Sequence, residues 1–177
     1  MKESPKVSEY DAYFEKYVNL VPKGDIVQQL EEQHKETDSL LNELTDAQGL
    51  FRYSPEKWSI KEVIGHLIDT ERILTYTLLC TARGEPVPLP RYDKDVYIQH
   101  AEFDKQSMKG LLAHFATSRK ATMHLLQSLQ SKDWVRTGIA LNSKVTVRAY
   151  VYILAGHELH HRKIIKGLYI GSSSFPE

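Results

Sequence analysis

Residues 147–168 read VRAYVYILAGHELHHRKIIKGL and contain no proline, and their apolar residues recur at the spacing of an α-helix. Laid out at about 100° per residue, the stretch carries one apolar stripe. His157 and His161 lie within that stripe, four residues apart, whereas His160 falls at its margin. The apolar members of the stripe are Val147, Tyr150, Leu154, Ile165 and Leu168. The stretch therefore predicts a helix that points two imidazole rings into a protein core.

Two further amphipathic helices are predicted upstream by their capping residues. The first begins after Asp25, a typical N-cap, and its apolar spacing continues to the region of Gly49. The second begins directly after Ser59, because Ser59 and Glu62 form the reciprocal pattern of a capping box. It must end around residues 84–86, since the proline there and two more shortly afterwards cannot continue a helix.

A third helix is predicted between a long loop and a turn. The loop continues through residues 91–97, after which Asp104 is the expected N-cap. Polar residues 131–133 close the helix, and Trp134 is expected to pack back onto the bundle. Residues 136–144 contain a glycine, an asparagine and a serine and predict a turn or a short hairpin before the last helix. The whole pattern predicts an all-α four-helix bundle with long connecting loops.

The length and the charge of the chain limit its class. Its 177 residues suit one domain, which we expect to span residues 1–177, with an N-terminal extension at 1–23 and a flexible tail at 172–177. Acidic and basic residues balance at 23 each, which argues against nucleic acid and membrane surfaces as partners. The single cysteine, Cys80, cannot form an internal disulfide, and residues 1–16 lack the apolar core of a signal peptide. We therefore expect a cytoplasmic protein.

A third histidine is placed by the second predicted helix. His66 lies beside the apolar stripe of that helix, next to Val63 and Thr70, on a flank that a neighbouring helix can approach. With His157 and His161 it would give three neutral imidazoles with open coordination positions, which suit zinc, nickel, iron or cobalt in a catalytic layout. A lone histidine is more often a hydrogen-bonded residue at the edge of a core, but an inward pair four residues apart is poorly explained in that way.

Two glutamates fall near the middle of apolar stripes on the same helical layout. They are Glu71 on the second predicted helix and Glu158 on the last one, and buried carboxylates need partners. Either carboxylate could orient a ligand histidine by accepting its second ring N–H. The alternative is a buried ion pair with Arg119 or Arg162, and the sequence leaves both interpretations open.

The last helix also fits a protease pattern. His157, Glu158 and His161 satisfy H-E-x-x-H, in which the histidines bind zinc and the glutamate serves as general base. Such enzymes need another ligand downstream, and the only later carboxylate in this sequence is that of Glu177, with no later histidine. The protease interpretation is therefore disfavoured.

Two segments of the sequence resemble the DinB-like superfamily, in particular its metal-dependent hydrolases and bacillithiol transferases. They are residues 58–69, WSIKEVIGHLID, and residues 156–162, GHELHHR, and the resemblance covers nearly the whole chain. The family takes one histidine from its second helix and a pair four residues apart from its last, which match His66, His157 and His161. The resemblance implies an up-down-down-up bundle, commonly a homodimer, with a pocket open to one side. The implied ion is nickel or zinc, with iron, cobalt or manganese as alternatives.

Three functions are compatible with this resemblance, and the residues do not separate them. In the first, which we favour, the metal activates a low-molecular-weight thiol of the bacillithiol type, and the metal-bound thiolate attacks an electrophilic small-molecule substrate. In the second, a metal-bound water hydrolyses the substrate. The third is a non-catalytic, stress-related binding module. Residues that could line the pocket mouth are Tyr92, Asp93, Lys94 and Tyr97, although a solvated loop explains them equally well.

Overall fold

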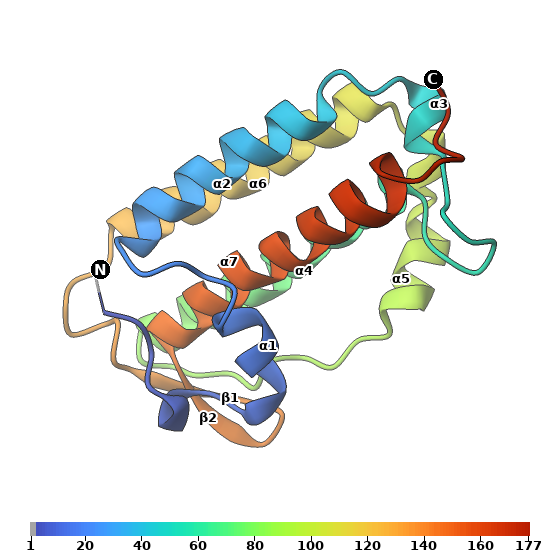
Figure 1. Ribbon diagram of the computed structural model, residues 1–177. Coiled ribbons are helices and arrows are strands. Elements are labelled where there is room, and N and C mark those ends of the chain that lie inside the picture. Colours follow the sequence, from blue (N-terminus) through green and yellow to red (C-terminus); the bar gives the residue numbers. More distant parts are fainter. Residues whose placement is uncertain (1–2) are drawn as a thin grey trace.

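Four long helices build the part of the protein that the computed structural model describes, residues 3–177 (Figure 1). Both α2 and α4 pack against α6 and α7, so α2 stands diagonally opposite α4, and α6 stands diagonally opposite α7. Followed along the chain, α2 and α7 run in one direction and α4 and α6 in the other, which confirms the expected up-down-down-up bundle. The bounds are α2 Ile26–Leu41, α4 Ile60–Ala82, α6 Met108–Gln127 and α7 Val147–Ile164.

Two of the long helices begin where their capping residues predict. The Asp25 carboxylate accepts hydrogen bonds from the first-turn amides of α2. Ser59 and Glu62 form the expected capping box at the start of α4. The start of α6 differs from the prediction, because Ser107 and not Asp104 is its N-cap. Asp104 instead accepts hydrogen bonds from Ser59 and from Arg52, so a carboxylate predicted to cap α6 holds the start of α4.

Two short helices interrupt segments that the sequence pattern had assigned differently. The first predicted helix was expected to reach Gly49, but α2 ends at Leu41, and a separate helix, α3 (Asp46–Gly49), follows. A capping box of Thr45 and Gln48 starts this new helix. Within the predicted loop, α5 (Lys94–Ala101) begins after Asp93, whose carboxylate accepts from two first-turn amides. A 3₁₀ turn, η3 (Phe103–Lys105), leads from α5 to α6.

The expected hairpin is present and sets the start of α7. Strands β1 (Thr137–Ala140) and β2 (Ser143–Thr146) pair antiparallel, with Gly138 opposite Val145. Thr146 ends the second strand and caps α7 through its hydroxyl group. Trp134 is 6% exposed and packs into the core, as predicted.

The last turns of α7 depart from the α-helical spacing that was used to place side chains. Residues Ile165–Ile170 form a π-helix, η4, in which each turn holds more residues than an α-turn. Leu168, expected in the apolar stripe, is therefore 49% exposed, while Tyr169 is buried. The tail that follows contacts the bundle, since Phe175 packs edge-on against Phe51.

The N-terminal segment lies against α7. It contains two 3₁₀ turns, η1 (Val7–Glu9) and η2 (Ala12–Phe14), and one short helix, α1 (Glu15–Val18). The backbone of α1 comes so close to α7 that a Cβ at position 156 would overlap the carbonyl oxygen of Tyr17, which explains why Gly156 is there. The expected N-terminal extension therefore contributes to the packed body from residue 3 onward, while residues 1 and 2 lie outside the described residues.

A layer of buried polar residues crosses the bundle and separates the two apolar halves of its core. Each long helix contributes to two apolar clusters, one on each side of this layer. The residues between the clusters include Thr37 of α2, Glu71 of α4, Arg119 of α6 and Glu158 of α7. Within residues 3–177, no helix combines the length and the apolar character needed to cross a lipid bilayer.

Candidate metal centre

The three histidines singled out from the sequence meet between α4 and α7. His66 comes from α4, and His157 and His161 lie one turn apart on α7. One ring nitrogen from each lies within 4.8 Å of the others, and the Nε2 atoms of His66 and His157 are 3.1 Å apart. His66 and His157 are 6% and 8% exposed. The structure thus brings all three side chains together, while His160 lies beside them and is partly exposed.

Burial keeps these three imidazoles uncharged at neutral pH. Desolvation, with a smaller contribution from the nearby Lys94 charge, lowers the pKa of His66 to about 4. Desolvation and the neighbouring rings lower the pKa of His161 to about 3, and they hold the pKa of His157 well below its ordinary value. Neutral imidazoles offer lone pairs, which are what a metal ion binds.

The donor set fits a divalent transition metal. Ligand nitrogens around a tetrahedral zinc ion, at bond lengths near 2.0–2.1 Å, would be separated by about 3.3 Å. The 3.1 Å between His66 and His157 is close to this value, so coordination would require small side-chain movements. Three neutral nitrogens on one side and a cleft on the other leave positions for further ligands, and imidazole suits several metals.

A short chain of hydrogen bonds fixes the ring of His66. Its Nδ1 lies 3.4 Å from Oγ1 of Thr70, which in turn lies 2.7 Å from the hydroxyl group of Tyr92. This contact leaves Nε2 directed toward His157. Sequence reasoning missed this role of Thr70, although its position four residues after His66 was a usable signal.

Two aromatic rings contact the histidines. The ring of Tyr17 in α1 meets His157 and His160 edge-on, each at 5.5 Å between centroids. The ring of Trp58 lies 4.9 Å from that of His66. Sequence reasoning missed both contacts, and the only local signal for Tyr17 was the glycine that precedes His157.

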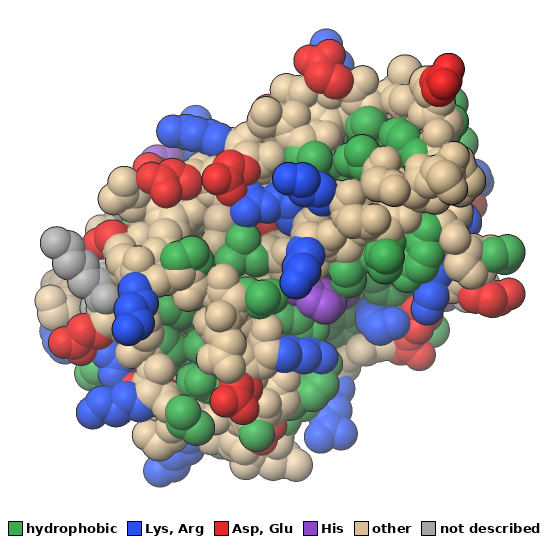
Figure 2. Space-filling model, viewed as in Figure 1, with side chains coloured by type: hydrophobic (Ala, Val, Ile, Leu, Met, Phe, Trp, Pro, Cys, Tyr) green, Lys and Arg blue, Asp and Glu red, His purple; other side chains and the backbone are tan. Residues whose placement is uncertain are grey.

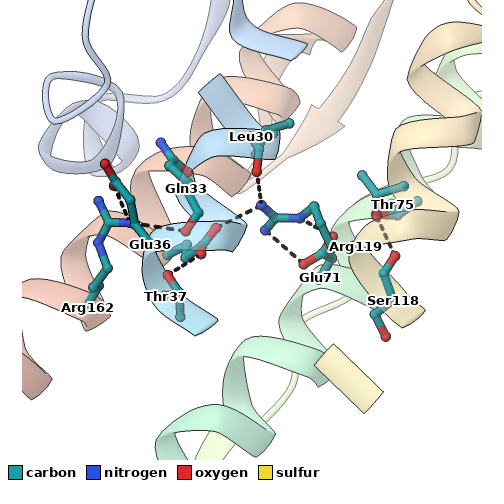
Figure 3. Close-up of polar contacts among 11 residues, drawn as sticks. Leu30, Gln33, Glu36, Thr37, Glu71, Thr75, Ser118, Arg119 and Arg162 are labelled. Atoms are coloured by element: carbon teal, nitrogen blue, oxygen red, sulfur yellow. Dashed lines mark hydrogen bonds and ion pairs between the residues drawn. The ribbon is translucent and has the colours of Figure 1, made fainter. Parts of the chain in front are cut away.

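The two buried glutamates face away from the histidines. Arg119 donates to both oxygens of Glu71, at 2.8 and 3.0 Å, and to Glu158 at 2.8 Å (Figure 3). Thr37 donates to the second oxygen of Glu158 at 2.6 Å. These contacts are the ion pair that was the alternative to a role in orienting histidines, because the carboxylates point into the bundle centre. Arg162 pairs instead with Glu36.

This placement also argues against the protease pattern. Glu158 is 1% exposed and its two oxygens are occupied by Arg119 and Thr37, so it cannot reach a substrate in the cleft. Both H-E-x-x-H histidines are at the site, but the glutamate that would serve as base is buried against Arg119 and Thr37 inside the bundle.

A cleft of about 1310 Å³ opens beside the histidines. Its walls come from α1, α4, α7 and the segment before α5, and they include three of the four residues expected at its mouth, Tyr92, Asp93 and Lys94. Tyr97 is not among the lining residues, and its ring lies 4.9 Å from that of Tyr92. On the face shown in Figure 2, a histidine is visible in a hollow bordered by basic and apolar side chains.

Comparisons with known proteins point to one family. The model of the DinB superfamily matches residues 29–165. Among solved structures, YfiT from Bacillus subtilis, described as a probable metal-dependent hydrolase with an unusual four-helix bundle topology, aligns over 97% of this chain and 95% of its own at 20% identity, with a TM-score of 0.74. The mycothiol-dependent maleylpyruvate isomerase aligns over 90% of this chain and 66% of its own at 11% identity, with a TM-score of 0.68. No curated protein sequence gave a significant match.

Proposed function

The chain belongs to the DinB superfamily, and from that premise we propose that it is a metal-dependent enzyme whose divalent ion is held by His66, His157 and His161. One observation carries the proposal: three uncharged imidazoles, two of them buried and the third partly buried, converge within 4.8 Å at the wall of a large cleft. The Nε2 atoms of His66 and His157 face one another at 3.1 Å, and a metal ion at this point would bind the lone pairs of both rings. Nickel or zinc is the proposed ion.

The proposed reaction is the transfer of a low-molecular-weight thiol, such as bacillithiol, to an electrophilic small molecule. A bound divalent ion would supply a lowered pKa for the thiol, so that it is a nucleophile near neutral pH. The sulfur forms a bond to the electrophilic carbon, the leaving group departs with its electron pair, and the thiol proton passes to solvent. The name of the mycothiol-dependent neighbour agrees with thiol chemistry on this fold.

The surroundings of the histidines favour a thiol over water as the nucleophile. Among residues 3–177, no carboxylate joins the three histidines in their cluster, and Glu71 and Glu158 are engaged by Arg119. Hydrolysis commonly uses such a carboxylate as general base, whereas a thiol of lowered pKa needs none. Hydrolysis by a metal-dependent route, as in the description of YfiT, remains the second candidate.

The protein's own side chains have two tasks in this scheme. The contact from Tyr92 through Thr70 holds the ring of His66 in one orientation. The aromatic rings of Tyr17 and Trp58 line the cleft against the histidines, where they would shield the reacting atoms from water.

The first test is the metal content per chain of tag-free protein, measured by elemental mass spectrometry. We expect near-stoichiometric metal in the wild type and in the control His160→Ala, and its loss in His66→Ala and His161→Ala. A wild type that stays metal-free after reconstitution would rule out the metalloenzyme.

The second test distinguishes the three candidate functions. The loaded protein is given an alkylating electrophile, such as monobromobimane, with bacillithiol and without it. Metal-dependent conversion that needs the thiol supports the transferase, and metal-dependent loss of an ester substrate without thiol supports the hydrolase. A metal that raises the melting temperature but supports no turnover would indicate the non-catalytic binding module.

Three further properties belong to the proposal. We propose that residues 1–177 act as one domain, because the N-terminal segment and the bundle share the walls of the cleft. The single cysteine suits the reducing cytoplasm. The family resemblance supports a homodimer, which sedimentation equilibrium would test.

A further inference from the structure

We propose that the cleft recognises an anionic group of its substrate or thiol, a carboxylate or a phosphate, through Lys16 and Lys94. The inference rests on the proposed function, because it names the class of molecule that the same site takes. Its basis is an arrangement that occurs twice around the histidines: a lysine ammonium group lies over an aromatic ring, and that ring contacts one of the histidines.

The first of these arrangements comes from the N-terminal segment. The Nζ atom of Lys16 lies 4.5 Å from the ring centroid of Tyr13 and 4.9 Å from that of Tyr17. Tyr17 contacts His157, so the positive charge is one ring away from the site. Among residues 3–177, no carboxylate lies within 4.0 Å of this ammonium group, which is exposed and can bind a ligand.

The second arrangement comes from the start of α5. The Nζ atom of Lys94 lies 4.7 Å from the ring centroid of Trp58, which contacts His66. Asp95 lies 3.0 Å from this ammonium group and also accepts a hydrogen bond from Trp58. Because Lys94 is partly neutralised, we expect it to contribute less to anion binding than Lys16.

The other charged residues that line the cleft also bear on anion binding. Two further cations line it, Lys57 and Arg91, and neither has a carboxylate partner among the described residues. Of the three acids in the lining, Asp93 caps α5 and Asp95 is paired with Lys94, which leaves Glu56. By formal charge the lining holds four cations and three carboxylates, an excess of one positive charge in a chain whose acidic and basic residues balance.

Each lysine is linked to the histidines through one aromatic ring. Lys16 lies over Tyr17, which contacts His157, and Lys94 lies over Trp58, which contacts His66. Lys16 also precedes residue 29, where the match to the family begins, so this contact belongs to the part of the chain that the family model does not cover.

The experiment compares two thiols that differ in charge. Zinc-loaded protein is titrated by calorimetry with mercaptosuccinate, which carries two carboxylates, and with the neutral β-mercaptoethanol. We expect wild type to bind mercaptosuccinate about tenfold more tightly, with the preference declining as salt is added. Lys16→Gln should reduce the preference about fivefold and Lys94→Gln by less, while Lys16→Arg retains it. The control Lys120→Gln removes an exposed charge on α6 and should change nothing.

A parallel titration of metal-free protein with succinate separates this inference from the proposed function. Succinate binding that is weakened in Lys16→Gln supports the anion site even if the protein binds no zinc. Zinc binding with equal affinity for the two thiols in wild type overturns the anion site and leaves the metal site standing. A preference that Lys16→Gln and Lys94→Gln leave unchanged also overturns it.

Discussion

His157 and Glu158 are neighbours in the sequence, yet they belong to two polar clusters of opposite character. Glu158 joins Glu71 and Arg119 inside the bundle, where each oxygen and nitrogen has a charged or hydrogen-bonding partner. His157 joins two other histidines at the cleft, and these rings have no charged partner among the described residues. The first, which we call the closed cluster, is held together by opposite charges within the chain. The second, the open cluster, consists of uncharged rings beside a cleft, and their nitrogen lone pairs suit a metal ion.

The largest expected effect comes from breaking the closed cluster. Arg119→Met would leave two buried carboxylates without their cation, and we expect a loss of about 3–5 kcal/mol in the free energy of unfolding, measured with denaturant. The matched control is Arg162→Met, whose partner Glu36 is exposed, with an expected loss below about 1 kcal/mol. Equal losses in the two variants would refute the closed character of the cluster.

The open cluster should make the free energy of unfolding of the metal-free protein depend on pH. Folded His66 has a pKa of about 4 against 6.5 for the ordinary group, so the unfolded chain takes up the proton first as pH falls. This difference leaves the free energy of unfolding unchanged above about pH 6.5 and lowers it by about 3 kcal/mol near pH 4. Denaturant unfolding at several pH values measures the loss.

Other groups also titrate in this range, so the comparison needs a control. A double variant, His66→Gln with His161→Gln, should lose less stability between pH 7 and pH 4 than the wild type does. If the two curves ran parallel, the histidines would not be the buried neutral bases described here.

A single added methyl group tests the close packing of α1 against α7 beside the open cluster. Gly156→Ala would place a Cβ against the carbonyl oxygen of Tyr17 and push α1 away from α7, at an expected cost of about 2 kcal/mol in unfolding free energy. The control is Gly167→Ala, where an added Cβ meets no atom within 4 Å. Thermal unfolding of both variants measures the difference, and a neutral Gly156→Ala would contradict the close approach.

The smallest change in unfolding free energy is expected for a variant that tests the role of Thr70. Thr70→Val keeps the shape of the side chain but removes the hydroxyl group that lies between His66 and Tyr92. We expect about tenfold weaker metal binding in competition with a chelating dye, and a change in unfolding free energy below about 1 kcal/mol. Thr75→Val, which alters a hydroxyl pair with Thr122, should leave metal binding unchanged.

The sequence predicted those parts of the fold that depend on neighbouring residues. Asp25 and Ser59 cap their helices as expected because an N-cap bonds to amides within the same turn. The inward pair His157 and His161 follows from helical spacing in the same way. The cap of α5 by Asp93 was also visible, but the prolines before it favoured a loop.

The rest depends on contacts between distant segments. Tyr17 lies beside His157 only because the N-terminal segment folds back onto α7, and no local pattern encodes that approach. The choice of Arg119 over Arg162 as partner of the glutamates depends on how α6 faces the bundle centre. Leu168 was misplaced because a π-helix changes the angular spacing after residue 164.

The position of Trp58 gives the protein an optical reporter of its own site. Its indole ring lies between the ammonium group of Lys94 and the ring of His66, so its emission depends on charges at the site. The chain has two tryptophans, and the other, Trp134, is buried in the apolar cluster on the hairpin side of the polar layer. In a Trp134→Phe background, intrinsic fluorescence would follow the arrival of a metal ion or a thiol without any added label.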